Sequence, residues 1–183
     1  ELQRLANMPS DSSSVEASDA SIKDIELVLE NFLSTPNVKD ALDYIAITNG
    51  CHSAFLTSLC GHGMHITRLT VPDLTLLGGK ESKKLYPIGA GDAVTAGSLA
   101  AWNFYRGTDM TGGNSNLLER IQRALSSNRF TSITNDVDNH VIASFAFGIA
   151  CGSASCLKEE NSMLSEDDVI RLFSEIKIES KER

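Results

Sequence analysis

The residues best suited to chemistry lie in the segment Tyr86–Gly97, where two glycines flank an alanine directly before an aspartate. Glycines allow a tight backbone turn and close approach of a ligand, because they have no Cβ. The pattern predicts a strand that ends at Ile88 and a helix that begins near Asp92. Free amides in the first turn, together with the helix dipole, can hold a phosphate or a developing anion.

Asp92 has two interpretations at this position. A carboxylate at a helix start can simply stabilise the helix, or it can accept a proton from an attacking hydroxyl. The segment is not a Walker loop, which needs Lys-Ser/Thr after its last glycine, and it lacks the third glycine of the dinucleotide fingerprint. Spacing alone leaves both interpretations of Asp92 open.

A second cluster, Cys60-Gly61-His62-Gly63-Met64-His65, contains metal-ligand residue types. A metal site would use Cys60, His62 and His65. A glycine turn that joins two strands is the favoured interpretation, since no fourth ligand lies nearby in the sequence.

The elements that must position these residues follow from apolar spacing and from glycine and proline breaks. These patterns predict helices over 21–33, from 92, over 117–125 and 140–151 and from 165, and strands over 44–48, 53–59, 64–71 and 84–88. Strands precede helices, which indicates an α/β fold with a central, largely parallel sheet flanked by helices. We expect one partial α/β domain over 1–183, with a flexible serine-rich insertion at 9–20 and a frayed tail at 177–183.

Composition narrows the classes of function. The chain has 183 residues, with 16 Lys and Arg against 24 Asp and Glu, for a net charge of −8. This acidity argues against nucleic acid or an anionic membrane as a partner. No apolar run approaches the roughly 18 residues of a membrane span. Four cysteines without a C-x-x-C pair indicate a reduced protein, for which we expect a cytoplasmic location.

The segment 89–97, Gly-Ala-Gly-Asp-Ala-Val-Thr-Ala-Gly, resembles the C-terminal signature of the ribokinase-like (PfkB) carbohydrate kinases. Three further stretches resemble motifs of that family in the same order: the start Glu1–Leu5, the hairpin 45–56 and the small-residue segment 147–155. The resemblance implies the C-terminal, nucleotide-side part of a ribokinase-like, Rossmann-type domain. It also implies that a substrate-binding N-terminal half is missing, so that the chain needs that half or self-associates.

The resemblance further implies an ATP-dependent phosphotransferase that acts on a hydroxyl of a sugar or sugar phosphate, with Mg²⁺ as a cofactor. Its implied site residues are Asp92 as the catalytic base, Gly89, Ala90 and Gly91 as the anion hole, Thr48, Gly50, Ala143 and Phe147 as nucleotide contacts, and Glu1 as a metal-associated residue. The family often has Asp-Thr-Thr where this chain has Tyr86-Pro87-Ile88, which leaves activation by a monovalent cation in question. The alternative is a non-catalytic nucleotide-binding or scaffold protein that keeps the kinase fold.

Overall fold

The computed structural model describes residues 22–33, 35, 41–59, 64–75, 84–106, 136–161 and 163–181. The helices are α1 (Ile22–Leu33), α2 (Ala90–Tyr105), α4 (Asp136–Ser155) and α5 (Glu166–Glu175), and the strands are β1 (Tyr44–Ile47), β2 (Ala54–Ser58), β3 (His65–Thr70) and β4 (Lys177–Lys181). These elements confirm the α/β class. The serine-rich segment 9–20 and the helix expected over 117–125 lie outside the described residues.

The sheet corrects the prediction of a largely parallel arrangement. Its strand order is β1-β2-β3-β4, and every neighbouring pair is antiparallel. Only six residues separate β1 from β2, and six separate β2 from β3. Parallel neighbours need a crossover of a dozen or more residues, so connections this short force the strands to reverse direction. A largely parallel Rossmann-type sheet is therefore wrong for the described residues.

Two local predictions also need correction. Residues 84–88 form no strand: the amide of Tyr86 donates to the carbonyl of Cys156 at 2.9 Å, and Pro87 has no amide to offer a ladder. The expected frayed tail instead forms β4 over Lys177–Lys181. Ile178 of β4 packs against the core, and Thr67 and Ser180 share a hydroxyl hydrogen bond of 3.1 Å, which together hold the strand on β3.

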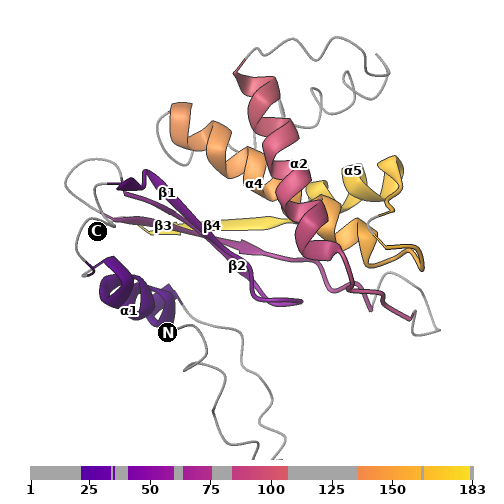
Figure 1. The fold of residues 1–183 in the computed structure, drawn as a ribbon, viewed down its shortest axis with the longest axis horizontal. Helices are drawn as coiled ribbons and strands as arrows, with labels where there is room; N and C mark the ends of the chain where they lie inside the picture. The colour runs from indigo at the N-terminus through magenta and orange to yellow at the C-terminus, as the bar shows by residue number, and fades with distance from the viewer. Residues whose placement is uncertain are drawn as a thin grey trace, which may run out of the picture.

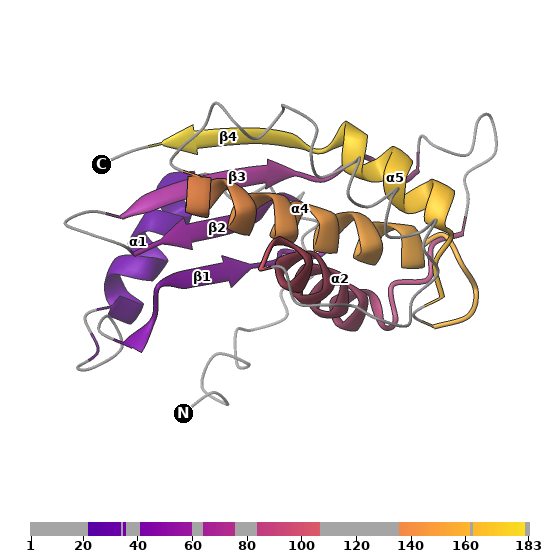
Figure 2. The ribbon, with the colours of Figure 1, turned by 90° about the horizontal axis from the view of Figure 1, so that it is seen from above.

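The helices cover both faces of the sheet. Helix α1 lies on one face, and α2, α4 and α5 lie on the other (Figure 1). Seen from above, α4 lies across the middle of the sheet, with α2 on its β1 side and α5 toward β4 (Figure 2). Side chains alternate accordingly along β2, since Phe55 packs with Ile25 and Leu29 of α1, whereas Leu56 joins the core under α4.

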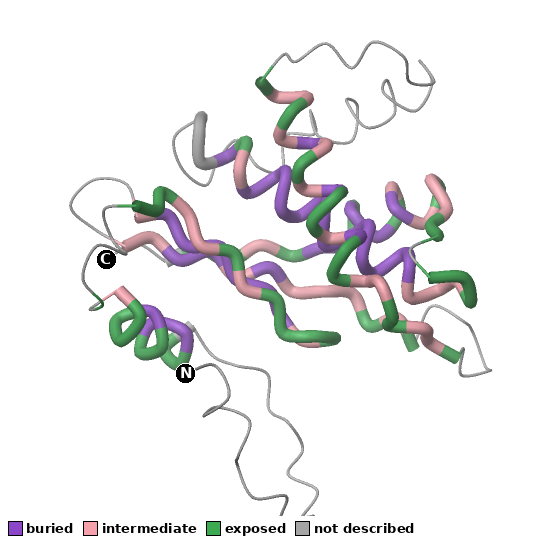
Figure 3. The backbone as a smooth tube through the Cα atoms, in the orientation of Figure 1, coloured by how far each residue is buried: buried purple, intermediate pink, exposed green. Residues whose placement is uncertain are grey.

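The larger core lies around α4. Every residue from 142 to 155 is buried, and the purple stretch in Figure 3 runs along this helix. Helix α4 therefore lies between α2, α5 and the sheet. By contrast, α1 is buried only along the stripe that contains Ile25 and Leu29, and its outer face, with Leu27 and Val28, is exposed.

Helices α2 and α4 approach each other closely because glycines line their contact. A Cβ built on Gly148 would overlap the carbonyl oxygen of Val94, and one on Gly97 would lie 2.7 Å from the sulfur of Cys151. Gly152 faces Val94 and Ala90 in the same way. The small residues of α2 thus form a helix–helix interface, which fixes the start of α2 against the end of α4.

Candidate functional site

The start of α2 has the geometry of an anion site. Gly89 is its N-cap and has a left-handed backbone, with φ of 82° and ψ of −2°, a region that glycine enters without steric cost. The amides of Ala90 and Ala93 donate to the carbonyls of Pro87 and Gly89. Those of Gly91 and Asp92 have no acceptor among the described residues. Two adjacent amides are therefore available at the positive end of a 16-residue helix.

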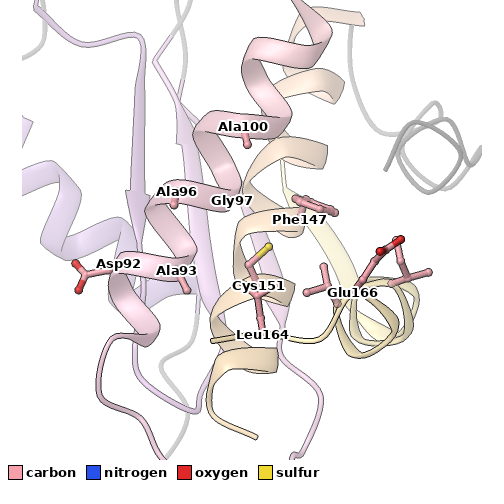
Figure 4. A pocket seen from close by; sticks show the side chains of 11 residues that line it. Asp92, Ala93, Ala96, Gly97, Ala100, Phe147, Cys151, Leu164 and Glu166 are labelled. Atoms are coloured by element: carbon pink, nitrogen blue, oxygen red, sulfur yellow. The ribbon is translucent and has the colours of Figure 1, made fainter. Parts of the chain in front are cut away.

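Asp92 lies in the first turn of α2 and is exposed. Its carboxylate points away from α4, on the opposite side of α2 from Phe147 and Cys151 (Figure 4). Thr95, one turn later, donates its hydroxyl to the carbonyl of Gly91 at 3.1 Å, so its side chain folds back on the helix. The structure thus sets the predicted base beside the amide of Gly91 and leaves its carboxylate open to solvent. The amide of Ala90, also expected in the anion hole, instead donates to the carbonyl of Pro87.

A pocket of about 550 Å³ lies between α2, α4 and α5. Its lining residues are mostly apolar, with carboxylates only at Asp92 and Glu166: Asp92, Ala93, Ala96, Gly97, Ala100, Phe147, Cys151, Leu164, Glu166, Val169 and Ile170. Since the Asp92 carboxylate points out of this pocket, the pocket does not unite that carboxylate with the apolar wall. None of these lining residues carries a cationic side chain that could pair with a triphosphate.

The two nucleotide contacts expected on α4 are both buried. Phe147 lines the pocket and packs edge to face against Phe173, with ring centroids 5.8 Å apart. Ala143 lies in the core and does not line the pocket. Phe147 thus lines the pocket between α2, α4 and α5, whereas Ala143 packs in the core, and their expected contact with adenine stays a prediction.

Thr48 and Gly50 lie in the turn that joins β1 to β2, and both are exposed. The turn is closed by a hydrogen bond from the amide of His52 to the carbonyl of Asn49, at 3.0 Å, and Gly50 has a positive φ of 56°. In the ribbon views β1 runs toward α2 and β2 returns from it, so this turn lies at the α2 end of the sheet (Figures 1 and 2). Neither residue lines the pocket.

The described residues test neither the expected metal-associated residue Glu1 nor the less favoured metal site at the cysteine–histidine cluster. Glu1, Cys60 and His62 all lie outside them, and His65, the remaining member of the cysteine–histidine cluster, begins β3. Within the described part of the chain, no three metal-ligating side chains gather at one place. Among the same residues, none of the helices has the length and apolar character needed to cross a membrane.

Sequence reasoning missed the contribution of α5 to the pocket. Leu164 and Glu166 lie at the start of α5, and Val169 and Ile170 follow one turn later. The capping pattern at Ser165 correctly predicted the helix, but nothing in a single sequence states which helix it will face. Cys151 is buried in the pocket wall, and burial raises the pKa of its thiol to about 12.

Comparison with models of protein families gives no match for this chain, and comparison with curated proteins gives none either.

Proposed function

We propose that the chain supplies the ATP-binding and catalytic-base portion of a phosphotransferase that moves a phosphoryl group from ATP to a hydroxyl of a sugar or sugar phosphate, with Asp92 as the general base. The observation that carries the proposal is the pair of amides of Gly91 and Asp92, for which the described residues offer no acceptor, at the positive start of α2 and next to an exposed carboxylate. The resemblance of segment 89–97 to the ribokinase-like carbohydrate kinases supports the same chemistry and supplies the substrate class.

The arrangement suits phosphoryl transfer because that reaction depends mainly on positioning and charge stabilisation. The amides of Gly91 and Asp92 would donate to the oxygens of the transferring phosphoryl group, where negative charge is concentrated. Asp92 would accept the proton of the attacking hydroxyl as the new oxygen–phosphorus bond forms. The bond between the γ-phosphorus and the oxygen that bridges it to the β-phosphate breaks, and ADP leaves.

The competing role for Asp92 is to stabilise the start of α2 without taking part in catalysis. A carboxylate in the first turn stabilises a helix by roughly 0.3–1 kcal/mol through the dipole. The amides do not separate the two roles, because the first turn of any α-helix leaves amides without an intrahelical acceptor, so the rate of phosphoryl transfer is what distinguishes them.

The test compares Asp92→Asn with Asp167→Asn. Asp167 is an exposed aspartate in the first turn of α5, so its replacement removes the same charge from an equivalent helix position outside the proposed site. Phosphoryl transfer to a panel of sugars and sugar phosphates should fall by about 10²- to 10⁴-fold in Asp92→Asn and stay unchanged in Asp167→Asn. ATP affinity should change little in either variant.

Near-parental turnover in Asp92→Asn would contradict the general-base role. A parental chain that binds ATP and transfers no phosphoryl group to any acceptor would favour the non-catalytic nucleotide-binding alternative.

A further inference from the structure

The four-stranded sheet has two edges that differ in charge. Strands β1 and β4 form these edges, on opposite sides of the sheet (Figure 2). Strand β4 carries a charged residue at every second position, namely Lys177, Glu179 and Lys181, whereas β1 and Thr48 after it carry none. Charged residues at an exposed edge, lysines above all, keep it from pairing with a further strand. The β4 edge is therefore guarded against such pairing, and the β1 edge is not.

The backbone of β1 presents hydrogen-bonding groups at this edge. The amide of Leu59 donates to the carbonyl of Asp43 at 2.8 Å, in register with the antiparallel pairing of β1 and β2. Residues of an antiparallel strand alternate between those whose backbone groups bond to the neighbouring strand and those whose groups point away from it. Since Asp43 bonds toward β2, the even-numbered residues of β1 point their N–H and C=O groups outward, and Ala46 is one of them.

Ala46 is exposed, and the described residues offer its outward N–H and C=O groups no partner. Backbone groups of this kind require hydrogen bonds, and at an open edge they serve as a template for another strand. The neighbouring Ile45 and Ile47 have partly buried side chains that pack with Phe55 on the α1 face of the sheet. The edge thus combines an open hydrogen-bonding ladder with an apolar border on one face.

Strand β1 is complementary to itself in the antiparallel direction. About a twofold axis at Ala46, the N–H of this residue in each copy faces the C=O of the same residue in the other. The same register places Ile45 opposite Ile47 of the second copy, and apolar β-branched pairs of this kind stabilise neighbouring strands. Asp43, the first charged residue before β1, lies opposite Asn49, so no like charges meet.

We propose that β1 pairs antiparallel with β1 of a second copy about a twofold axis at Ala46, which joins the two sheets into one. This inference does not depend on the proposed function. Because β1 runs toward α2, antiparallel pairing places the α2 helices of the two copies at opposite ends of the joined strands. A contact one strand long buries less surface than a stable dimer needs, so the association is weak and depends on concentration.

The experiment measures self-association of the full chain by sedimentation equilibrium from about 1 μM to about 1 mM, which covers the weak affinities of a small interface. The variants are Ala46→Lys and Ala46→Glu, studied separately and as an equimolar mixture. The control is Ala96→Lys, which makes the same substitution at an exposed alanine of α2, away from the edge. Circular dichroism checks the fold of each variant, and NMR follows hydrogen exchange of the Ala46 amide in the parental chain.

We expect the parental chain to shift toward twice the monomer mass as its concentration rises, while exchange of the Ala46 amide slows. Each charged variant alone should associate about tenfold more weakly or worse, because two like charges then lie on Cα atoms about 5.5 Å apart across the axis. In the mixture lysine faces glutamate, and association should return to within about threefold of the parental value. Ala96→Lys should associate like the parental chain.

Four results would overturn the inference. A parental chain that stays monomeric up to about 1 mM would show that the β1 edge does not receive a second copy. Undiminished association in the charged variants, or fast exchange of the Ala46 amide in an associated parental chain, would place the contact on another surface. Losses in both variants without recovery in the mixture would exclude an axis at Ala46. If one charged variant does not fold, the other variant and the parental amide exchange still decide between these outcomes.

Discussion

Replacing Gly148 by alanine tests the close contact between α2 and α4 on which the position of the candidate site depends. The added Cβ would overlap the Val94 carbonyl oxygen and the Ser98 hydroxyl, and it would lie 2.9 Å from the Ser98 backbone nitrogen. The hydroxyl can rotate away. The two backbone atoms belong to α2 and cannot move unless the helices separate.

The magnitude follows from two opposing effects. Overpacking of a dense interior costs about 1–3 kcal/mol, and a clash with backbone lies at the upper end because no rotamer change relieves it. Alanine is better than glycine inside a helix by about 1 kcal/mol, which offsets part of the loss. We therefore expect Gly148→Ala to lower the free energy of unfolding by about 2 kcal/mol, or the melting temperature by roughly 4–8 °C for a chain of this size.

The assay is chemical denaturation followed by circular dichroism, with Gly91→Ala as the matched control. A Cβ on Gly91 meets nothing within 4 Å, and this glycine also lies in a helix. That variant should be neutral or more stable by up to about 1 kcal/mol. If Gly148→Ala is as stable as Gly91→Ala, then α2 and α4 do not pack as closely as in the structure. The position of the start of α2 against α4 would then be wrong as well.

Three further predictions concern other parts of the fold. Gly89→Ala should destabilise the protein by about 1–2 kcal/mol, measured by the same denaturation, because φ of 82° is unfavourable for a residue with a Cβ; equal stability would refute the left-handed cap. Leu29→Ala should cost about 2–5 kcal/mol, since this side chain is 1% exposed under the sheet, whereas Leu27→Ala on the outer face, where Leu27 is 62% exposed, should change stability by less than about 0.5 kcal/mol. Burial raises the pKa of the Cys151 thiol from its ordinary 9.0 to about 12. The unfolded chain therefore loses this proton at lower pH than the folded chain does, and the free energy of unfolding should fall as pH rises from about 9 to 12. In denaturation measured across this range, Cys151→Ala should flatten the pH dependence, and an unaltered slope would contradict the burial.

Much of the local structure could be predicted from the sequence. The helix over 22–33, the three strands before residue 71 and the last helix follow from apolar spacing, glycine turns and the acidic first turn after Ser165. The start of α2 follows in the same way, within two residues of the position expected at Asp92. These features depend on backbone freedom and on neighbours three or four residues apart, which a single sequence displays directly.

The direction of the strands and the pairing of the helices needed the tertiary structure. The charges at 177–183 suggested a frayed end, but the alternating Ile176 and Ile178 meet an apolar surface provided by α4 and β3, and this burial makes the segment a strand. Likewise, the local sequence does not show why α4 contains glycines. The reason appears only in the fold, where Val94 and Ser98 of α2 lie against them.

The candidate site likewise contains residues that the sequence alone places together and residues that only the tertiary structure places. The amides and the carboxylate lie within four consecutive residues, 89–92, so the sequence alone determined that they would meet. The turn at 48–53 and the pocket wall on α5 come from separate segments. Their distances are set by how the sheet and the helices bury apolar surface together, and a side chain's direction relative to a distant element is decided only when that packing is complete.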